Sequence, residues 1–157
     1  MDKHVTDHRH SDETINELIE LLFFAYRDFI TDPDNILEKL DFGRAHHRVI
    51  HFVDRKPGLT VAELLDLLGI TKQSLARVLK QLVDGDYIEQ RAGPQDRRQR
   101  ELYLTDIGKG LISQLREPQS RRIRQAIMDS DQNPTGIARF LRSMIDDRAK
   151  RQIETLE

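Results

Sequence analysis

The feature that most constrains the fold is the stretch 59–88, which has the pattern of two short amphipathic helices joined by a tight turn. Thr60 and Glu63 have the spacing of a capping box, in which each side chain satisfies a free backbone donor at a helix start. Gly69 is a natural helix end, and Thr71 can cap a second helix after a turn of about three residues. The second helix repeats apolar residues at i, i+3, i+4 and i+7: Leu75, Val78, Leu79 and Leu82. This pattern predicts a helix-turn-helix.

Two segments that alternate apolar and polar residues follow directly. Residues 87–91 and 101–104 have the period of half-buried strands, and Gly93-Pro94 lies between them. The sequence therefore predicts a β-hairpin attached to the helix-turn-helix, which is a winged helix. The expected fold class is mainly α with a small β-hairpin wing.

Further helices are expected on both sides of this unit. We predict a helix from Asp12 that stops at Asp32-Pro33, and a second helix over 44–55. After the hairpin, Thr105 caps a long helix over about 106–129, and Asn133-Pro134 opens a last helix. The chain divides into four parts: a flexible N-terminus at 1–11, N-terminal helices at 12–55, the winged helix at 56–105, and C-terminal helices at 106–157.

Charge is distributed unevenly along a chain whose formal net charge is only −2. Residues 12–42 hold nine acids against two bases, whereas residues 71–100 hold seven bases against four acids. A local basic stretch in an acidic chain favours a surface that binds a polyanion. No apolar run is long enough for a membrane span, and there is no cysteine for disulfides or thiolate metal sites. We expect a cytoplasmic protein without a cofactor.

The polar face of the second helix suits a DNA groove. Arg binds guanine through two hydrogen bonds, Gln reads adenine, and Lys neutralises phosphate. Ser74 lies near the helix start, where backbone N–H groups favour a phosphate. The alternative is an ordinary solvated helix face. The predicted contact residues of this helix are Thr71, Lys72, Gln73, Ser74, Ala76, Arg77 and Lys80.

The hairpin strengthens the DNA interpretation, because four arginines surround its Gly-Pro turn: Arg91, Arg97, Arg98 and Arg100. An arginine at a hairpin tip can enter the minor groove, and we expect Arg98 to do so. A neighbouring carboxylate, Asp96, is expected to hold the Arg98 guanidinium in place. The alternative is a charged hairpin that only protects a sheet edge.

The chain resembles the multiple-antibiotic-resistance regulator (MarR) family of bacterial winged-helix transcription factors. The resemblance covers residues 59–111, and its most specific part is Asp96-Arg97-Arg98 followed by Leu104, Thr105 and Gly108. It implies a homodimer, held by the N- and C-terminal helices, that binds a palindromic operator on double-stranded DNA. It also implies repression that ends when a small, often phenolic, molecule binds between the dimer helices and the DNA-binding part. The lack of cysteine excludes the peroxide-sensing branch of the family.

Three histidines in the segment DFGRAHHRVIHFV depart from the usual family pattern. His47 and His51 share one helix face and could hold zinc if His4, His8 or His10 supplied a third ligand. Arg48, however, would oppose a cation. We favour a ligand pocket lined by Phe23, Tyr26, His47 and His51, with zinc-responsive regulation as the alternative.

An enzyme is not expected, because the chain has neither a Gly-rich phosphate loop nor a nucleophile with a placed base. The sequence therefore predicts a sequence-specific transcription regulator. A non-regulatory architectural DNA-binding protein is a second alternative, and a footprint without sequence preference would favour it.

Overall fold

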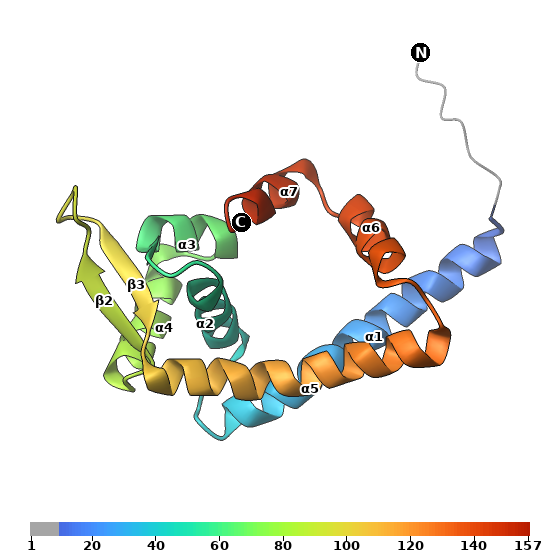
Figure 1. Cartoon of the computed structure of the whole chain (residues 1–157), viewed down its shortest axis with the longest axis horizontal. Coiled ribbons are helices and arrows are strands. Elements are labelled where there is room, and N and C mark those ends of the chain that lie inside the picture. The colour runs from blue at the N-terminus through green and yellow to red at the C-terminus, as the bar shows by residue number, and fades with distance from the viewer. Residues whose placement is uncertain (1–9) are drawn as a thin grey trace, which may run out of the picture.

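The helix-turn-helix forms where its capping residues predict it, at the centre of a mostly helical chain (Figure 1). The computed structural model describes residues 10–157. Its elements, in chain order, are α1 (Asp12–Glu38), α2 (Arg44–Arg55), β1 (Leu59–Thr60), α3 (Val61–Leu68), α4 (Lys72–Asp84), β2 (Ile88–Ala92), β3 (Arg100–Leu104), α5 (Asp106–Ser130), α6 (Pro134–Met144) and α7 (Asp147–Glu154).

The caps of α3 and α4 form at the predicted residues, but only the Thr60 half of the capping box is present, because the Glu63 carboxylate bonds to the Thr60 hydroxyl and not to a backbone N–H. Thr60 accepts from the backbone N–H of Glu63 at 3.2 Å, and its hydroxyl donates to the Glu63 carboxylate at 3.1 Å. Gly69 ends α3 in the left-handed region with φ 61°. Thr71 then accepts from the Ser74 N–H at 3.1 Å and starts α4. These side chains satisfy helix-end donors that would otherwise lack a partner.

The sheet has three strands in the order β1-β3-β2, all antiparallel. Ile88 pairs with Leu104 and Ala92 with Arg100, so β2 and β3 form the predicted hairpin, which we call the wing (residues 88–104). The sequence analysis missed β1, because two residues are too short to show an alternating pattern. Leu59 of β1 pairs with Leu102 of β3, and both side chains are buried.

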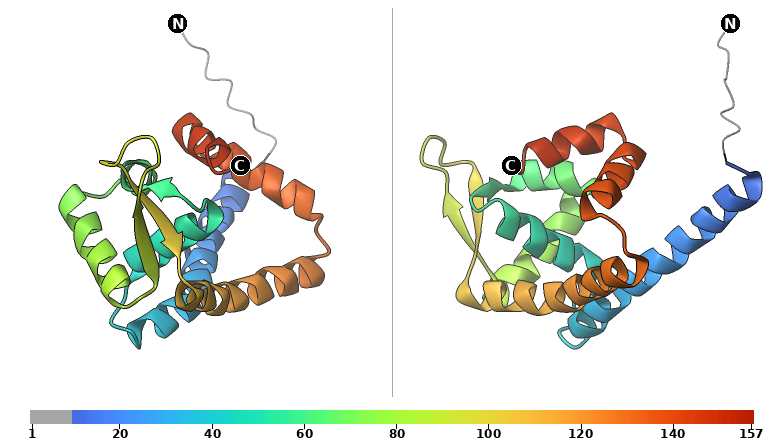
Figure 2. Two further views of the ribbon diagram at one scale, coloured as in Figure 1. Left: turned by 60° about the vertical axis from the view of Figure 1, so that its left-hand side comes forward. Right: turned by 45° about the vertical axis from the view of Figure 1, so that its right-hand side comes forward.

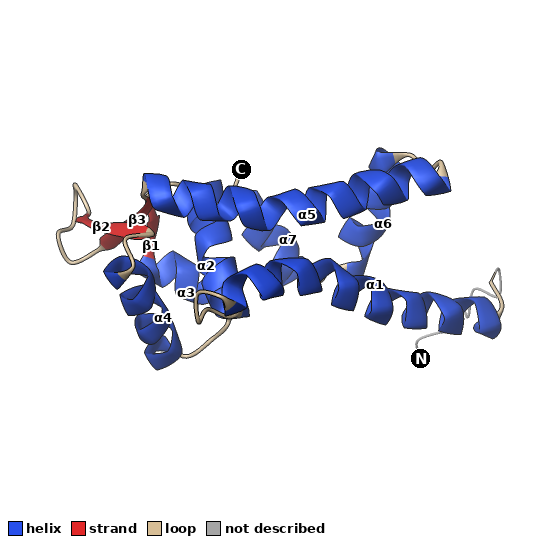
Figure 3. Cartoon of the chain, turned by 90° about the horizontal axis from the view of Figure 1, so that it is seen from below, coloured by secondary structure: helices blue, strands red, loops and turns tan. Residues whose placement is uncertain are grey.

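A single core joins the sheet to α2, α3, α4 and the first half of α5. Leu64, Leu75 and Leu82 from the helix-turn-helix meet Ile50 of α2 and Leu115 of α5, and all five are almost fully buried. We call this unit the winged-helix lobe. The long helices α1 and α5 lie side by side and extend away from it (Figure 3).

The predicted end of α1 at Asp32-Pro33 is wrong, because the helix continues through Pro33 to Glu38. A proline has no N–H to give to the carbonyl four residues earlier, which here belongs to Phe29. That carbonyl instead accepts a weak hydrogen bond of 3.4 Å from the Gln119 side chain on α5. Pro33 itself is buried, so tertiary packing overrides its helix-breaking tendency.

The C-terminus also differs from the prediction of a single last helix. α6 ends at Met144, and Asp146 caps the additional helix α7 by accepting from the Ala149 N–H at 2.7 Å. α7 turns back toward α3 (Figure 2). There Arg148 forms an ion pair of 3.4 Å with Asp66. No helix among residues 10–157 is long and apolar enough to cross a membrane. The prediction for residues 1–11 falls mostly on residues 1–9, which lie outside the described part.

The junction between the wing and α5 explains the Leu-Thr-x-x-Gly pattern. Thr105 caps α5 by accepting from the Gly108 N–H at 3.1 Å, while its own N–H donates to the Tyr87 carbonyl at 3.1 Å. A Cβ on Gly108 would lie 2.1 Å from that carbonyl oxygen, so only glycine fits. Gly110, one half-turn further along α5, would meet nothing within 4 Å.

These two glycines give a matched stability test. Gly108→Ala should lower the free energy of unfolding by about 2–3 kcal/mol, because the new methyl group must push α5 away from the Tyr87 backbone. Gly110→Ala should instead raise it by about 0.5–1 kcal/mol, since alanine favours the helix. Chemical denaturation of both variants measures this difference. Equal effects would contradict the close approach of α5 to Tyr87.

Candidate nucleic-acid interface

Helix α4 presents one exposed polar face to solvent. Its apolar residues Leu75, Val78, Leu79 and Leu82 are buried in the lobe. The residues between them are exposed at Lys72, Gln73, Ala76, Arg77 and Lys80, and Ser74 is half-buried. The structure therefore places the predicted contact residues of α4 on its outer side and at its N-terminal cap.

The cations of this face differ in how they are held. Lys80 forms an ion pair of 2.6 Å with Asp84, one turn later on the same helix. Within residues 10–157, no ion pair involves Lys72 or Arg77. Lys72 and Arg77 can therefore meet an anion without first breaking a salt bridge.

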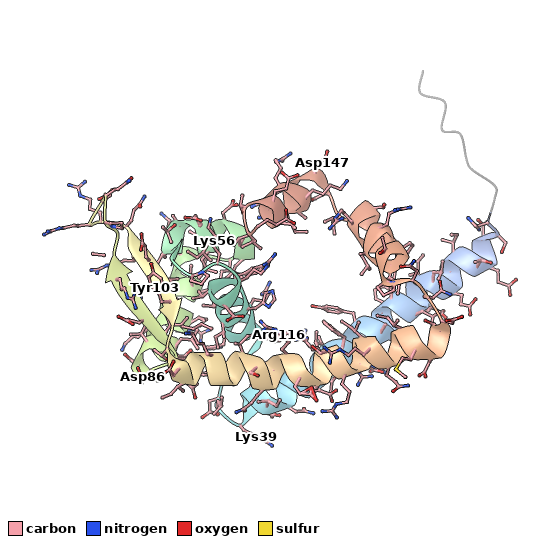
Figure 4. All side chains as sticks on the ribbon, in the orientation of Figure 1. Lys39, Lys56, Asp86, Tyr103, Arg116 and Asp147 are labelled. Carbon is pink, nitrogen blue, oxygen red and sulfur yellow. The ribbon has the colours of Figure 1, made fainter. Side chains whose placement is uncertain are left out.

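The loop at the tip of the wing is closed by backbone hydrogen bonds. Gly93 donates to the Gln99 carbonyl at 2.9 Å, and Gln99 donates to the Asp96 carbonyl at 3.1 Å. A Cβ on Gly93 would lie 2.7 Å from the Asp96 carbonyl oxygen, so the loop requires glycine there. The side chains of this loop project into solvent (Figure 4).

The sequence led us to expect that Asp96 holds the Arg98 guanidinium, but in this structure Asp96 bonds to the Arg98 backbone instead. Its carboxylate accepts from the backbone N–H of Arg98 at 2.9 Å, which is the local turn geometry that aspartate favours. Asp96 thus fixes the course of the loop, and the Arg98 side chain leaves from a defined backbone. Among the described residues, Arg97, Arg98 and Arg100 form no ion pair.

Arg91 differs from the other arginines of the wing. It forms two hydrogen bonds with Glu89 at 3.1 and 3.2 Å, and its guanidinium lies 4.1 Å from the centre of the Tyr103 ring. The arginine keeps the pKa of the Glu89 carboxyl below its usual value. Tyr103 in turn donates to Glu101 at 2.9 Å. Arg91 is therefore held along the sheet, away from the tip of the wing.

One cleft joins the wing to the helix-turn-helix. It has a volume of about 440 Å³, with an apolar floor from α3 and α4 that includes Leu65 and Leu75. Lys72, Arg98 and Arg100 line it together with Ala76. Residues separated by more than twenty positions in the chain thus form one cationic surface, which could follow a DNA backbone.

The residues of the expected ligand pocket are spread over α1 and α2. Phe23 and Tyr26 lie on the free part of α1 and are 72% and 61% exposed. His47 is half-buried near Asp34, and the exposed His51 lies near Asp54 and Arg116, which form an ion pair of 2.6 Å. Arg116 is labelled in Figure 4. Burial lowers the pKa of both histidines, and for His47 the neighbouring His51 lowers it further.

The zinc hypothesis gains no support from this region. In the part of the chain from 10 to 157, no three His, Asp or Glu side chains are grouped so that they could hold a metal ion. His4 and His8, two of the proposed third ligands, lie outside the described residues. His10 is exposed and lies just before α1.

Sequence analysis overlooked His46, which is only 7% exposed. Its Nδ1 accepts from the Gly43 N–H at 3.0 Å, and its Nε2 lies 2.7 Å from Oε1 of Gln81 on α4. A usable signal existed: His46, Val49, Ile50 and Val53 follow the i, i+3, i+4, i+7 spacing of a core face. His47 and His51 lie on a more exposed face of α2 than His46 does.

Comparison with known proteins identifies similar chains. Residues 40–99 match the model of the MarR family. The chain is 46% identical over 148 residues to the HTH-type transcriptional regulator PetP of Rhodobacter capsulatus, covering 94% of this chain and 89% of that one. It is 35% identical over 75 residues, 48% of this chain and 38% of the other, to the exopolysaccharide II synthesis transcriptional activator ExpG of Rhizobium meliloti.

The fold has a solved counterpart as well. A mutant MarR from E. coli, crystallised in complex with operator DNA, superposes with a TM-score of 0.61 at 20% identity. The match covers 85% of this chain and 97% of that one. At this identity the likeness concerns the fold.

The histidines predict a defined pH dependence of stability. Burial lowers the folded-state pKa of His46, His47 and His51 below the usual 6.5. Near and below that pH the unfolded chain therefore binds more protons, and the free energy of unfolding should fall as pH decreases from about 8 to about 5.5. Denaturation at fixed protein concentration measures the slope.

Two variants test whether these histidines cause the pH dependence of the free energy of unfolding. Replacing His47 and His51 together by Gln should reduce the loss of stability on acidification, because two of the three rings with a lowered pKa are removed. His10→Gln, at an exposed site, should leave the slope unchanged. A stability independent of pH over this range would contradict the lowered pKa of these three histidines.

Proposed function

Because this chain belongs to the MarR family of DNA-binding transcription regulators, we propose that it binds a palindromic operator as a homodimer and represses transcription until a small molecule releases it. The family and the matched relatives are regulators, so the chain is not an enzyme. The observation that carries the proposal is the shared cationic surface of α4 and the wing, where Lys72, Arg98 and Arg100 line one cleft.

On this proposal, α4 enters the major groove. Gln73, Ala76 and Arg77 face base edges, while Lys72 and Lys80 lie on phosphates. Lys80 must exchange its ion pair with Asp84 for a phosphate, so its contribution is smaller than that of Lys72. The hydroxyls of Thr71 and Ser74, which are 2.9 Å apart, lie near the backbone at the start of the helix.

The wing extends the same surface. Arg98 enters the minor groove from a loop that Asp96 holds in shape, and Arg97 contacts phosphate. Arg100 lines the cleft together with Lys72, and both approach the same strand of DNA. Arg91 is paired with Glu89 and stacked on Tyr103, so it supports the sheet and makes at most a secondary contact.

A second subunit accounts for the exposed apolar surface. A compact monomer of this mass exposes about 8,200 Å², whereas this chain exposes 12012 Å². The apolar side chains on the outer faces of α1 and α6 are 37–56% exposed at Ile15, Leu18, Ile19, Leu22, Phe140, Leu141 and Met144. Patches of this kind mark interfaces. A two-fold dimer would place its two α4 helices about 34 Å apart, one turn of DNA.

The same dimer would complete the ligand site. Phe23, Tyr26 and His51 are too exposed to enclose a ligand in one chain, whereas His47 is half-buried. A partner packed on α1 would close the space above these four residues, and their rings suit an aromatic acid. Binding there would change the distance between the two lobes and release the DNA.

Activation is a second candidate for the regulatory outcome. The relative with 35% identity over 48% of this chain is named as a transcriptional activator. DNA recognition would be the same in both cases, because it depends on α4 and the wing. Only the position of the operator relative to the promoter would differ.

Selection of bound sequences from random duplex DNA tests the proposal. We expect a palindrome with half-sites one helical turn apart, since the dimer would present two copies of α4 with two-fold symmetry. Recovery of no preferred sequence would favour an architectural DNA-binding protein. An asymmetric site of half the length would contradict dimeric recognition.

Arg77 should read a base. Arg77→Ala is expected to weaken binding to the selected operator by about 1–3 kcal/mol and to relax preference at one position in each half-site. Titration of labelled operator and random duplexes measures both effects. Equal weakening on the two duplexes would mean that Arg77 contacts phosphate instead.

Asp96 should act through the loop backbone and not through its charge. Asp96→Ala and Asp96→Asn remove the same negative charge, but Asn can still accept from the Arg98 N–H. We expect Asp96→Asn to bind operator at least as tightly as the wild type, and Asp96→Ala to bind about two- to tenfold more weakly. Equal tightening in both variants would show that only the charge matters.

A further inference from the structure

We propose that His46 is a positioning residue for DNA binding, which fixes the Gln81 carboxamide so that its amide nitrogen donates to a DNA phosphate beside Arg77. The inference rests on the proposed function, in which the outer face of α4 lies on DNA. It assigns a role to two residues that neither the fold nor the expected groove contacts explain.

The hydrogen bonds of the His46 ring define its protonation. The Gly43 N–H donates to Nδ1 at 3.0 Å, so Nδ1 carries no proton. In the neutral ring the proton is then on Nε2, which lies 2.7 Å from Gln81 and must donate to it. Burial, with Arg77 nearby, lowers the pKa of His46 and keeps the ring in this neutral form.

The same bond sets the orientation of Gln81. A carboxamide has one acceptor and one donor end, and the donor on His46 can only bond to the acceptor Oε1. The Gln81 amide nitrogen is therefore directed to the other side. Among residues 10–157 the Gln81 amide nitrogen forms no hydrogen bond, and Gln81 is exposed. Held by His46, the Gln81 amide group thus presents its two N–H donors to solvent at a fixed position.

Aromatic packing makes the ring of His46 a rigid support. It stacks on Phe42 with centroids 4.5 Å apart and an interplanar angle of 12°. Phe42 also meets Tyr87, just before the wing, edge-on at 5.4 Å. Residues from the start of α2, from α4 and from the base of the wing therefore determine where the Gln81 amide points.

The position on α4 indicates what the amide contacts. Ser74 and Gln81 are seven residues apart, so they lie on the same side of the helix, next to Arg77. This side flanks the outward face that carries Gln73, Arg77 and Lys80. A donor at the flank of a helix in the major groove lies nearer the sugar-phosphate backbone than the base edges, and neutral amides are common phosphate donors.

Two substitutions and their combination test the coupling. His46→Leu and Gln81→Ala should each weaken binding by about two- to tenfold, the size of one hydrogen bond to DNA. The double variant should be no weaker than the weaker single variant, because both changes remove the same contact. His46→Gln keeps an acceptor for Gly43 and a donor for Gln81, and should bind within about twofold of the wild type.

The probes are the selected operator duplex and a random duplex of equal length, each titrated at several salt concentrations. Gln81→Ala should weaken both equally and leave the salt dependence unchanged, because a neutral donor releases no counterion. Thermal melting shows that each variant is folded at the temperature of measurement. Gln81→Ala, at an exposed position, tests the contact even if His46→Leu fails to fold.

Several results would overturn the inference. It fails if Gln81→Ala binds as the wild type does, if the single losses multiply in the double variant, or if His46→Gln is as weak as His46→Leu. Arg77→Ala, measured on the same duplexes, separates this failure from that of the proposed function. If Arg77→Ala loses affinity and Gln81→Ala does not, α4 still binds DNA and only the role of His46 is wrong.

Discussion

The junction at Tyr87 determines how the parts of this molecule are connected. The Tyr87 N–H donates to the Leu82 carbonyl at the end of α4, and the Tyr87 carbonyl accepts from Thr105 at the start of α5. Gly108 allows α5 to approach that carbonyl closely, and Phe42 packs on the Tyr87 ring. One residue thus links α4, the base of the wing and the long helix α5 that leads away from the lobe. A change in the angle of α5 would therefore move α4 and the wing together.

The distribution of charge complements this geometry. The acids of α1 are partly neutralised by cations of neighbouring elements, as in the ion pairs of Asp32 with Arg122 and of Asp34 with Arg44. The cations at the start of α4 and at the tip of the wing have no such partners among the described residues. A chain with a net charge of −2 can therefore attract a polyanion on one surface while its acidic helices keep DNA away from the others.

Local signals in the sequence were sufficient for the winged-helix lobe. Caps, apolar spacing and the Gly93 turn are short-range features, and α2, α3, α4 and the hairpin formed where they predicted. Long-range compensation was not visible. The passage of α1 through Pro33 depends on Gln119, almost ninety residues later in the chain. The sequence predicted which residues of the candidate site are exposed, but it did not predict their partners. Asp96 bonds to a backbone N–H, Arg91 is held by Glu89, and His46 on α2 bonds to Gln81 on α4.

The central claim is that two copies of α4 and the wing bind successive turns of one duplex. A hydroxyl-radical footprint of the protein on its selected operator tests this most directly, because it reports which sugars are covered on each strand. The account predicts protection with two-fold symmetry, with centres about one helical turn (10–10.5 bp) apart and outer protected segments where the wings lie. Protection of a single unsymmetrical segment, or uniform protection along the whole duplex, would contradict it.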